Sequence, residues 1–587
     1  MKMKKIFLIL AAAVVLSSVA FADDGGSYRP EDWTYGNIYV KEPNKKIALE
    51  KELMIVEQTA SYRWDEKTEG STFLHGSEVE AVFGFRNTVA ERIVVPCAFP
   101  VVVKMPFTVR KDGSVTAHIN YSAKPLIGLW EFVLNKRGVK KDERDGKEFL
   151  YDFIRYDRSL YAQKEEIFSL DKKLQTLPAD EYLARVKMYG DLKTLQPCEI
   201  VQDGKKVAVQ TVGVETSIEK DEEASENYAD SDDRGVEVYN LNLTLHFYHE
   251  LTFKPSAASV LSVKYAIDSE SRSYHGTSYE LFYDISTGGT WKGDIKSFLV
   301  LTDSDMQAKN SKTGFEKTDL GEMCSSYRTY MYAAENYKPG KDEYFVFSTE
   351  HRFYEAGEMP LEEREAQGFV SGIRASSALS GSYKMAGEGN NDSALASSTY
   401  EAKTSFDGNI LNGWVEGGAG DGIGEWIEFT LSKPALGPFA TNGLRRFYGE
   451  ERDDKDEWWY DEDEFSVFER AGGVRGTWEA NNRVKSMTLT DGEGRKITAL
   501  EFSDKFPHLS AIPADWIGQN AVRNPVFLPR GTYRMTIESV FKGKKWDDTV
   551  LGEVWFIPLG GRAARILAGD PLLCERLTKA VSVFAGE

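Results

Sequence analysis

The chain has 587 residues, of which 41% are hydrophobic, 12% aromatic and 28% charged, and its net charge is −20. This length corresponds to about three or four domains. The apolar content allows each domain to bury a core, which excludes general disorder. The acidic balance argues against nucleic acids and anionic membranes as partners. Four cysteines and seven histidines exclude a disulfide-rich scaffold and leave little material for a metalloenzyme.

The start of the chain has the organisation of a secretory signal peptide over residues 1–22. Lys2, Lys4 and Lys5 precede an apolar run, and Ala20-Phe21-Ala22 provides a small-x-small cleavage pattern. The apolar run is too short for a membrane-spanning helix. We therefore expect an exported protein, periplasmic or extracellular, without stable membrane insertion. Removal of the three lysines takes the net charge from −20 to −23. A retained signal anchor is the alternative.

The four cysteines, Cys97, Cys198, Cys324 and Cys574, lie far apart and form no C-x-x-C pattern, so no zinc site is predicted. Export permits disulfides, so a Cys97–Cys198 or a Cys198–Cys324 bridge is possible. Cys97 lies in an apolar run over residues 94–99, which favours a buried free thiol just as well. The sequence does not choose between these states.

Alternation of apolar and polar residues with a period of two dominates the first half of the chain. The pattern is clear over residues 79–85, 241–247 and 260–267, and two further strand-like segments, 279–285 and 295–301, flank a glycine-rich turn region. Such alternation is typical of antiparallel strands with one buried face. We therefore expect a mainly β fold, in which residues 23–368 form a β-sandwich region of one or two subdomains.

One segment departs from this period. Between residues 157 and 195, apolar residues recur at helix-like spacing on both sides of Pro178. This spacing predicts a helical hairpin inserted between strands. The acidic run over residues 219–233 follows. It lacks the ligand order of a calcium-binding loop, so we expect a solvated loop and no metal site.

Three segments of the first half carry a diffuse resemblance to known sequences. They are Phe85-Arg86-Asn87, Val95-Pro96-Cys97-Ala98-Phe99-Pro100 and Thr287-Gly288-Gly289-Thr290-Trp291-Lys292-Gly293. Together they resemble a group of uncharacterised secreted bacterial domains of β-sandwich type. That group has no settled activity, so the resemblance bears on the fold and not on the function.

A second domain is expected over residues 373–558. It opens with Arg374-Ala375-Ser376-Ser377 and continues through an ordered set of motifs at residues 404–409, 412–417, 422–429, 441–443, 481–485, 540–549 and 551–556. In this order the motifs resemble the discoidin-like (coagulation-factor, or F5/8, type C) domain attached to secreted bacterial NAD glycohydrolases, where it serves in glycan binding and toxin translocation. The resemblance implies a galactose-binding-like jelly-roll sandwich with a carbohydrate-binding face formed by loops at one end.

Six residues of this second domain are the predicted ligand contacts: Trp414, Glu416, Trp458, Trp459, Arg483 and Lys485. Trp458 and Trp459 lie in an acidic, aromatic insertion over residues 449–464. Its rings can stack on pyranose faces while its carboxylates accept hydroxyl protons. The alternatives are an insertion that folds back on the sandwich and, for Trp414, a packing role. Asp547 and Asp548 are interpreted as groups that fix the turn before the final strand.

No catalytic constellation is evident in the sequence. His246 and His249 are three apart on a predicted strand and therefore face opposite sides, and nucleophile, zinc-binding and phosphate-loop motifs are absent. The predicted function is non-catalytic recognition of a glycan or another cell-envelope component, without a cofactor. Two alternatives stay open. One is a hydrolase with carboxylates in a cleft between the halves, and the other is a structural envelope protein that binds other proteins through sheet edges.

The last part of the chain, residues 559–587, shows a broadly helical pattern that is interrupted at Pro571. The segment is too short and too charged to span a membrane. We expect a helical appendage that packs either on the sandwich or on a partner.

Overall fold

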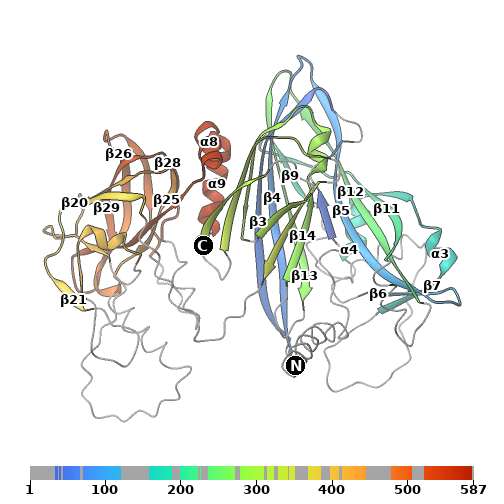
Figure 1. Cartoon of the computed structure of the whole chain (residues 1–587), viewed down its shortest axis with the longest axis horizontal. Helices are drawn as coiled ribbons and strands as arrows, with labels where there is room; N and C mark the ends of the chain where they lie inside the picture. Colours follow the sequence, from blue (N-terminus) through green and yellow to red (C-terminus); the bar gives the residue numbers. More distant parts are fainter. Residues whose placement is uncertain are drawn as a thin grey trace, which may run out of the picture.

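The computed structural model describes residues 33–36, 39–40, 44–65, 70–119, 158–187, 198–221, 225, 236–271, 278–303, 305–309, 314–322, 328–340, 343–350, 368–384, 397–408, 413–444, 478–504 and 521–584. This part of the chain is mainly β and forms two β-sandwiches with two helices between them (Figure 1). The expected fold class is therefore confirmed. The predicted signal peptide, residues 1–22, lies outside the described residues.

The first sandwich is formed by two large sheets that share one core. The first sheet contains β1 (Trp33–Gly36), β2 (Tyr39–Val40), β5 (Ile93–Val109), β6 (Ser114–Ile119), β7 (Arg158–Gln163), β8 (Lys173–Pro178), β11 (Thr211–Lys220), β12 (Glu237–Phe253), β14 (Ser278–Asp284), β16 (Asp305–Lys309) and β19 (Tyr344–Glu350). The second contains β3 (Ile47–Asp65), β4 (Gly70–Asn87), β9 (Glu199–Gln202), β10 (Lys205–Val207), β13 (Ala258–Ser271), β15 (Ile295–Thr302), β17 (Glu316–Glu322) and β18 (Arg328–Tyr337). A 3-10 turn, η4 (Ser286–Thr290), connects β14 to β15.

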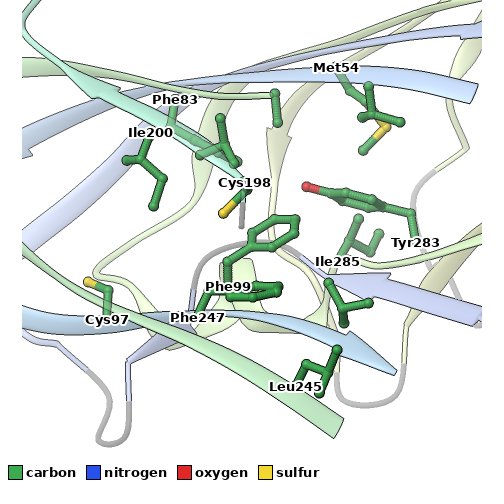
Figure 2. Packing of buried hydrophobic residues seen from close by; sticks show 14 of the residues in the cluster. Met54, Phe83, Cys97, Phe99, Cys198, Ile200, Leu245, Phe247, Tyr283 and Ile285 are labelled. Carbon is green, nitrogen blue, oxygen red and sulfur yellow. The ribbon is translucent and has the colours of Figure 1, made fainter. Parts of the chain in front are cut away.

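The period of two seen in the sequence marks the faces that point between these sheets. In β4 the odd positions from Val79 to Phe85 are buried, and in β12 the odd positions from Leu241 to Phe247 are buried in the same core. Figure 2 shows side chains of both sheets, such as Phe83 and Phe99, pointing into this shared interior. The alternation therefore predicted both the strands and their buried face correctly.

The predicted helical hairpin over residues 157–195 is wrong in its greater part. Within this range β7 and β8 are strands, and the helices α3 (Lys164–Phe168) and α4 (Ala179–Lys187) are short. The apolar residues that suggested a helix face, such as Ile167, Leu170 and Tyr182, are still buried in the core. They reach it from separate short elements because β8 pairs with β11, so strand pairing overrides the helix-like spacing. Residues 188–195 lie outside the described part.

Cys97 and Cys198 are free and buried in the first sandwich, and Figure 2 shows both side chains among core residues. The possible Cys97–Cys198 bridge is therefore wrong, and the free thiol of Cys198 also contradicts a Cys198–Cys324 bridge. Burial raises the pKa of Cys198 to about 12 and raises the pKa of Cys97 as well. Both thiols stay protonated at neutral pH, which makes them poor nucleophiles.

The second sandwich is a nine-stranded sheet that encloses its own core. It contains β20 (Val370–Ala375), β23 (Trp414–Val415), β24 (Trp426–Leu431), β25 (Ala435–Asn442), β26 (Asn482–Asp491), β27 (Lys496–Glu501), β28 (Val526–Leu528), β29 (Gly531–Phe541) and β30 (Thr549–Pro558). The short strands β21 (Ser382–Lys384) and β22 (Ser397–Thr399) pair with each other, and η5 (Ala402–Ser405) is a 3-10 turn. Ile427 and Phe429 of β24 are buried while Glu428 and Thr430 are not, as their alternation predicted.

The C-terminal segment forms the helices α8 (Gly561–Gly569) and α9 (Pro571–Phe584), which lie between the two sandwiches (Figure 1). We call this pair the C-terminal hairpin. Its apolar residues join one cluster with the outer face of β3, β4, β15 and β18 and with β25 and β30 of the second sandwich. The helical appendage expected from the sequence therefore packs on both sandwiches of its own chain. None of the helices in the described residues is long and apolar enough to span a membrane.

Candidate functional site

Three segments meet at one end of the second sandwich, which we call the loop end. They are residues 413–425, residues 478–485 and the connection 541–549 between β29 and β30. Backbone hydrogen bonds tie them together. Glu416 N–H donates to the Thr549 carbonyl (3.2 Å), and Trp546 N–H donates to the Ala480 carbonyl (2.9 Å). The residues expected to contact a ligand at positions 414, 416, 483 and 485 all lie in these segments.

The connection 541–549 is wound around the side chain of Asn482, which is fully buried. The amide oxygen of Asn482 accepts a hydrogen bond from Gly543 N–H (2.8 Å), and its amide nitrogen donates to the Asp547 carbonyl (2.5 Å). Position 543 requires glycine, because a Cβ there would lie 2.4 Å from the Ala480 carbonyl oxygen. A single buried side chain thus fixes both ends of the turn.

Glu416 fastens the neighbouring segment to the start of β30. One carboxylate oxygen accepts a hydrogen bond from Thr549 N–H (3.1 Å), and the other accepts one from Gly418 N–H (2.8 Å). Burial raises the pKa of Glu416, although these two bonds act in the opposite direction. Gly422 lies directly against this side chain, where a Cβ would come within 2.7 Å of Glu416 Cγ. Glu416 is therefore an internal support of the loop end.

Trp414 and Arg483 are also internal. Trp414 is fully buried, and its indole N–H donates to the Ser377 carbonyl (2.8 Å). The Arg483 guanidinium pairs with Asp504 (2.7 Å) and lies 4.0 Å from the centre of the Trp478 ring. Trp414, Glu416 and Arg483, three of the predicted ligand contacts, are therefore buried side chains of the loop end. Their hydrogen bonds and ion pair hold the loops in place.

Lys485 is exposed at the same end, and its ammonium group lies 5.9 Å from the centre of the Phe541 ring. It is the predicted contact that remains available to a ligand. The ammonium of Lys545 lies 4.5 Å from the ring centre of the half-exposed Trp546. Trp458 and Trp459, with the insertion 449–464, lie outside the described residues.

The remaining charges of the loop end are partly paired. Lys542 forms an ion pair with Asp421 (3.0 Å), and Lys544 forms one with Glu479. The carboxyl group of Asp547 is at the surface. An indole ring beside ammonium and carboxylate groups can stack on a pyranose face while those groups bond to its hydroxyls. The described residues contain no group of three or more side chains that could ligate a metal ion.

A second half-exposed tryptophan, Trp426, lies on the outer face of the second sandwich. The Arg534 guanidinium lies 4.0 Å from its ring centre and that of Arg374 lies 5.8 Å away. Both guanidinium groups also pair with Glu428, at 2.8 and 2.5 Å. The two guanidinium groups lie against the Trp426 ring, and their N–H donors are already paired with Glu428. This face therefore offers a ligand fewer contacts than the loop end does.

Asn482 and Trp546 are two residues of the loop end that the sequence analysis did not single out. Both lie in motifs that the resemblance used, residues 481–485 and 540–549. For Trp546 a signal was available, because a single large aromatic residue in a polar, glycine-containing stretch indicates an exposed ring in a loop. Nothing in the sequence shows that Asn482 lies inside a turn some sixty residues later, because that contact depends on how β26, β29 and β30 are paired.

Comparisons with known proteins give no family for this chain. No family model matches it, and no curated protein matches it. Among solved structures, a protein from Legionella pneumophila that is provisionally described as a nutrient binding protein is similar, with 10% sequence identity and a TM-score of 0.24. The match covers 54% of this chain and 70% of that chain. This similarity is too low to carry a conclusion about fold or function.

Proposed function

We propose that this chain is an exported, non-catalytic protein that binds a glycan or a similar cell-envelope component through the loop end of the second sandwich. Export rests on the signal-peptide pattern of residues 1–22. The observation that carries the binding proposal is the connection 541–549. Its backbone is fixed around Asn482, and it presents Trp546 and Lys545 at the surface.

A fixed backbone favours recognition because the loop does not lose conformational freedom when a ligand binds. The aromatic ring supplies apolar area at low entropic cost, as is typical of binding sites built on rigid aromatic side chains. The discoidin-like resemblance of residues 373–558 independently implies a glycan site formed by loops at one end. The two arguments point to the same end of the sandwich.

The two alternative functions find less support. A hydrolase in an interdomain cleft needs carboxylates that converge there. In the described residues, the contact between the hairpin and the second sandwich is formed by apolar side chains such as Phe439, Trp555 and Ile557. An envelope protein that binds through sheet edges would not need a loop wound around a buried asparagine.

A glycan array probed with the chain from residue 23 onward tests the proposal. The isolated fragment 373–558 is less suitable, because Trp555 and Ile557 would lose the hairpin that covers them. We expect a defined set of glycans to bind, and we expect Trp546→Ala to weaken that binding at least about tenfold, as is typical for an aromatic hot spot. If no glycan binds, the proposal is wrong.

Trp426→Ala is the matched control, since it removes a second half-exposed indole from the same sandwich. Loss of binding in Trp426→Ala together with full binding in Trp546→Ala would move the site to the outer sheet face. Trp458→Ala and Trp459→Ala test the insertion separately. Unchanged binding in both variants would exclude its aromatic residues as a sugar platform.

A further inference from the structure

We propose that the C-terminal hairpin is anchored to the first sandwich and that the second sandwich turns on it as a rigid body, with a hinge at Leu559–Gly560. The hinge thereby sets the direction in which the loop end points. The hairpin directly follows β30 of the second sandwich in sequence, yet its ion pairs in the described residues are with the first sandwich. That difference between its two sides carries the inference.

On the first-sandwich side, α8 is held by polar contacts at its start and along its length. The Arg562 N–H donates to the Glu316 carboxylate (2.7 Å), and the Arg562 guanidinium donates to the Gly314 carbonyl (2.7 Å). Further along the helix, Arg565 pairs with Glu335 of β18 (2.6 Å). These bonds orient α8 on the first sandwich, which it also contacts through apolar side chains of β15 and β18.

The residue between the two helices, Asp570, is also held by the first sandwich. It is 4% exposed, and one of its carboxylate oxygens accepts a hydrogen bond from Leu573 N–H (3.2 Å) at the start of α9. The other oxygen pairs with Lys51 of β3 (2.6 Å). The Lys51 side chain reaches it by lying over Gly84, where a Cβ would come within 3.0 Å. Arg576 of α9 approaches Glu80 of β4 as well (3.6 Å).

On the second-sandwich side the contacts are apolar. The hairpin packs against Leu436, Phe439, Phe527, Trp555 and Ile557, and the rings of Phe439 and Trp555 stack with centroids 5.9 Å apart. Within the described part of the chain, no ion pair joins the hairpin to the second sandwich. Polar contacts on this side include that of the Cys574 thiol with the backbone of Phe527. Just before the hairpin, Leu559 N–H donates to the Pro434 carbonyl (3.0 Å), which holds Leu559 on the second sandwich.

Apolar contact is not directional, so it resists rotation less than ion pairs and hydrogen bonds of fixed geometry do. The interface between hairpin and second sandwich is therefore the one that opens or slides. The hinge lies immediately before α8, because the Glu316 carboxylate of the first sandwich holds the helix from residue 562 onward. The same carboxylate also packs against Gly560, where a Cβ would lie 2.2 Å from its oxygen, so a larger residue does not fit at this position.

Thiol labelling of Cys574 measures the opening of this interface. Cys574 is half-buried where α9 meets β28, whereas Cys97 and Cys198 are buried inside the first sandwich. The chain from residue 23 onward is labelled with a small maleimide, and each cysteine is quantified by peptide mass spectrometry. We expect Phe439→Ala to raise the labelling rate of Cys574 at least about tenfold, because it removes part of the apolar contact. Labelling of Cys97 and Cys198 stays slow if the first sandwich remains folded.

Lys51→Met is the matched variant on the other side of the hairpin, and we expect it to leave the labelling rate of Cys574 unchanged. The reverse pattern, or an equal increase in both variants, would overturn the proposal. Phe527→Ala serves as a second variant at the same interface, since this residue is only partly buried and lies on the short strand β28. If Phe439→Ala disturbs the second sandwich itself, Phe527→Ala is used in its place, and we again expect faster labelling of Cys574. An unchanged rate in Phe527→Ala would count against the hinge.

Discussion

Replacement of Asn482 by alanine tests whether binding needs the fixed backbone of the connection 541–549, because it leaves the exposed side chains of that connection unchanged. The substitution removes the acceptor for Gly543 N–H and the donor to the Asp547 carbonyl. Loss of one partner of a buried hydrogen bond costs about 1–3 kcal/mol. Two such losses, partly relieved by water at this exposed turn, should cost about 2–4 kcal/mol. The open form of the turn then becomes roughly 30- to 700-fold more populated.

Hydrogen exchange followed by mass spectrometry measures this effect directly. Exchange at the amides of residues 543–546 should accelerate in Asn482→Ala, and the affinity for the glycan ligand should fall because the binding-competent turn is less populated. Asn524→Ala is the control, since the Asn524 side chain also bonds to two backbone groups, those of Glu501 and Ala499, in another turn. Unchanged exchange in Asn482→Ala, or the same acceleration in Asn524→Ala, would refute the reasoning.

Two further predictions concern the first sandwich. Burial lowers the pKa of His249 below its usual 6.5. The unfolded state therefore takes up a proton first as the pH falls, and the stability of the fold decreases below about pH 6.5. The midpoints of urea unfolding at pH 7 and pH 5 should differ less in His249→Phe than in the parent chain. Glu57 and Glu78 are direct cross-strand partners, and burial together with Glu78 raises the pKa of Glu57. Its contribution to stability therefore falls as the pH rises above 4.5, and Glu57→Gln should stabilise the chain by about 0.2–1 kcal/mol at pH 7 and have little effect at pH 4, as urea unfolding would show.

The long strands of this chain were predictable because their information is local. Side chains alternate across a strand, so the apolar residues at the odd positions of 79–85 and 241–247 already indicate which face of each strand is buried. The segment 157–195 shows the limit of this reasoning. Its apolar spacing fits a helix, but β8 gains a complete ladder of hydrogen bonds with β11, and that gain comes from a strand that lies more than thirty residues later.

The candidate site shows a different limit. The motifs around Trp414, Glu416 and Arg483 lie in segments that meet at the loop end, but a motif does not show the depth of a side chain. Glycine at positions 418 and 422 leaves room for the Glu416 side chain to turn inward and accept backbone hydrogen bonds. Trp546, by contrast, lies within the turn that Asn482 holds through Gly543 and Asp547, and its ring is half-exposed. Exposure is thus set by contacts between segments that are distant in sequence.

The loop end and the hinge act on different properties of binding. The geometry of the turn around Asn482 is internal to the second sandwich, so rotation about Leu559–Gly560 leaves the affinity for a soluble oligosaccharide unchanged. A ligand that is part of a surface is different, because the first sandwich must then fit beside that surface at the same time. In that case the hinge determines which orientations are compatible with binding, and the ion pairs of Asp570 and Arg565 with the first sandwich keep the pivot in a fixed place. We therefore propose that the turn determines the affinity and that the hairpin determines the orientation of the site.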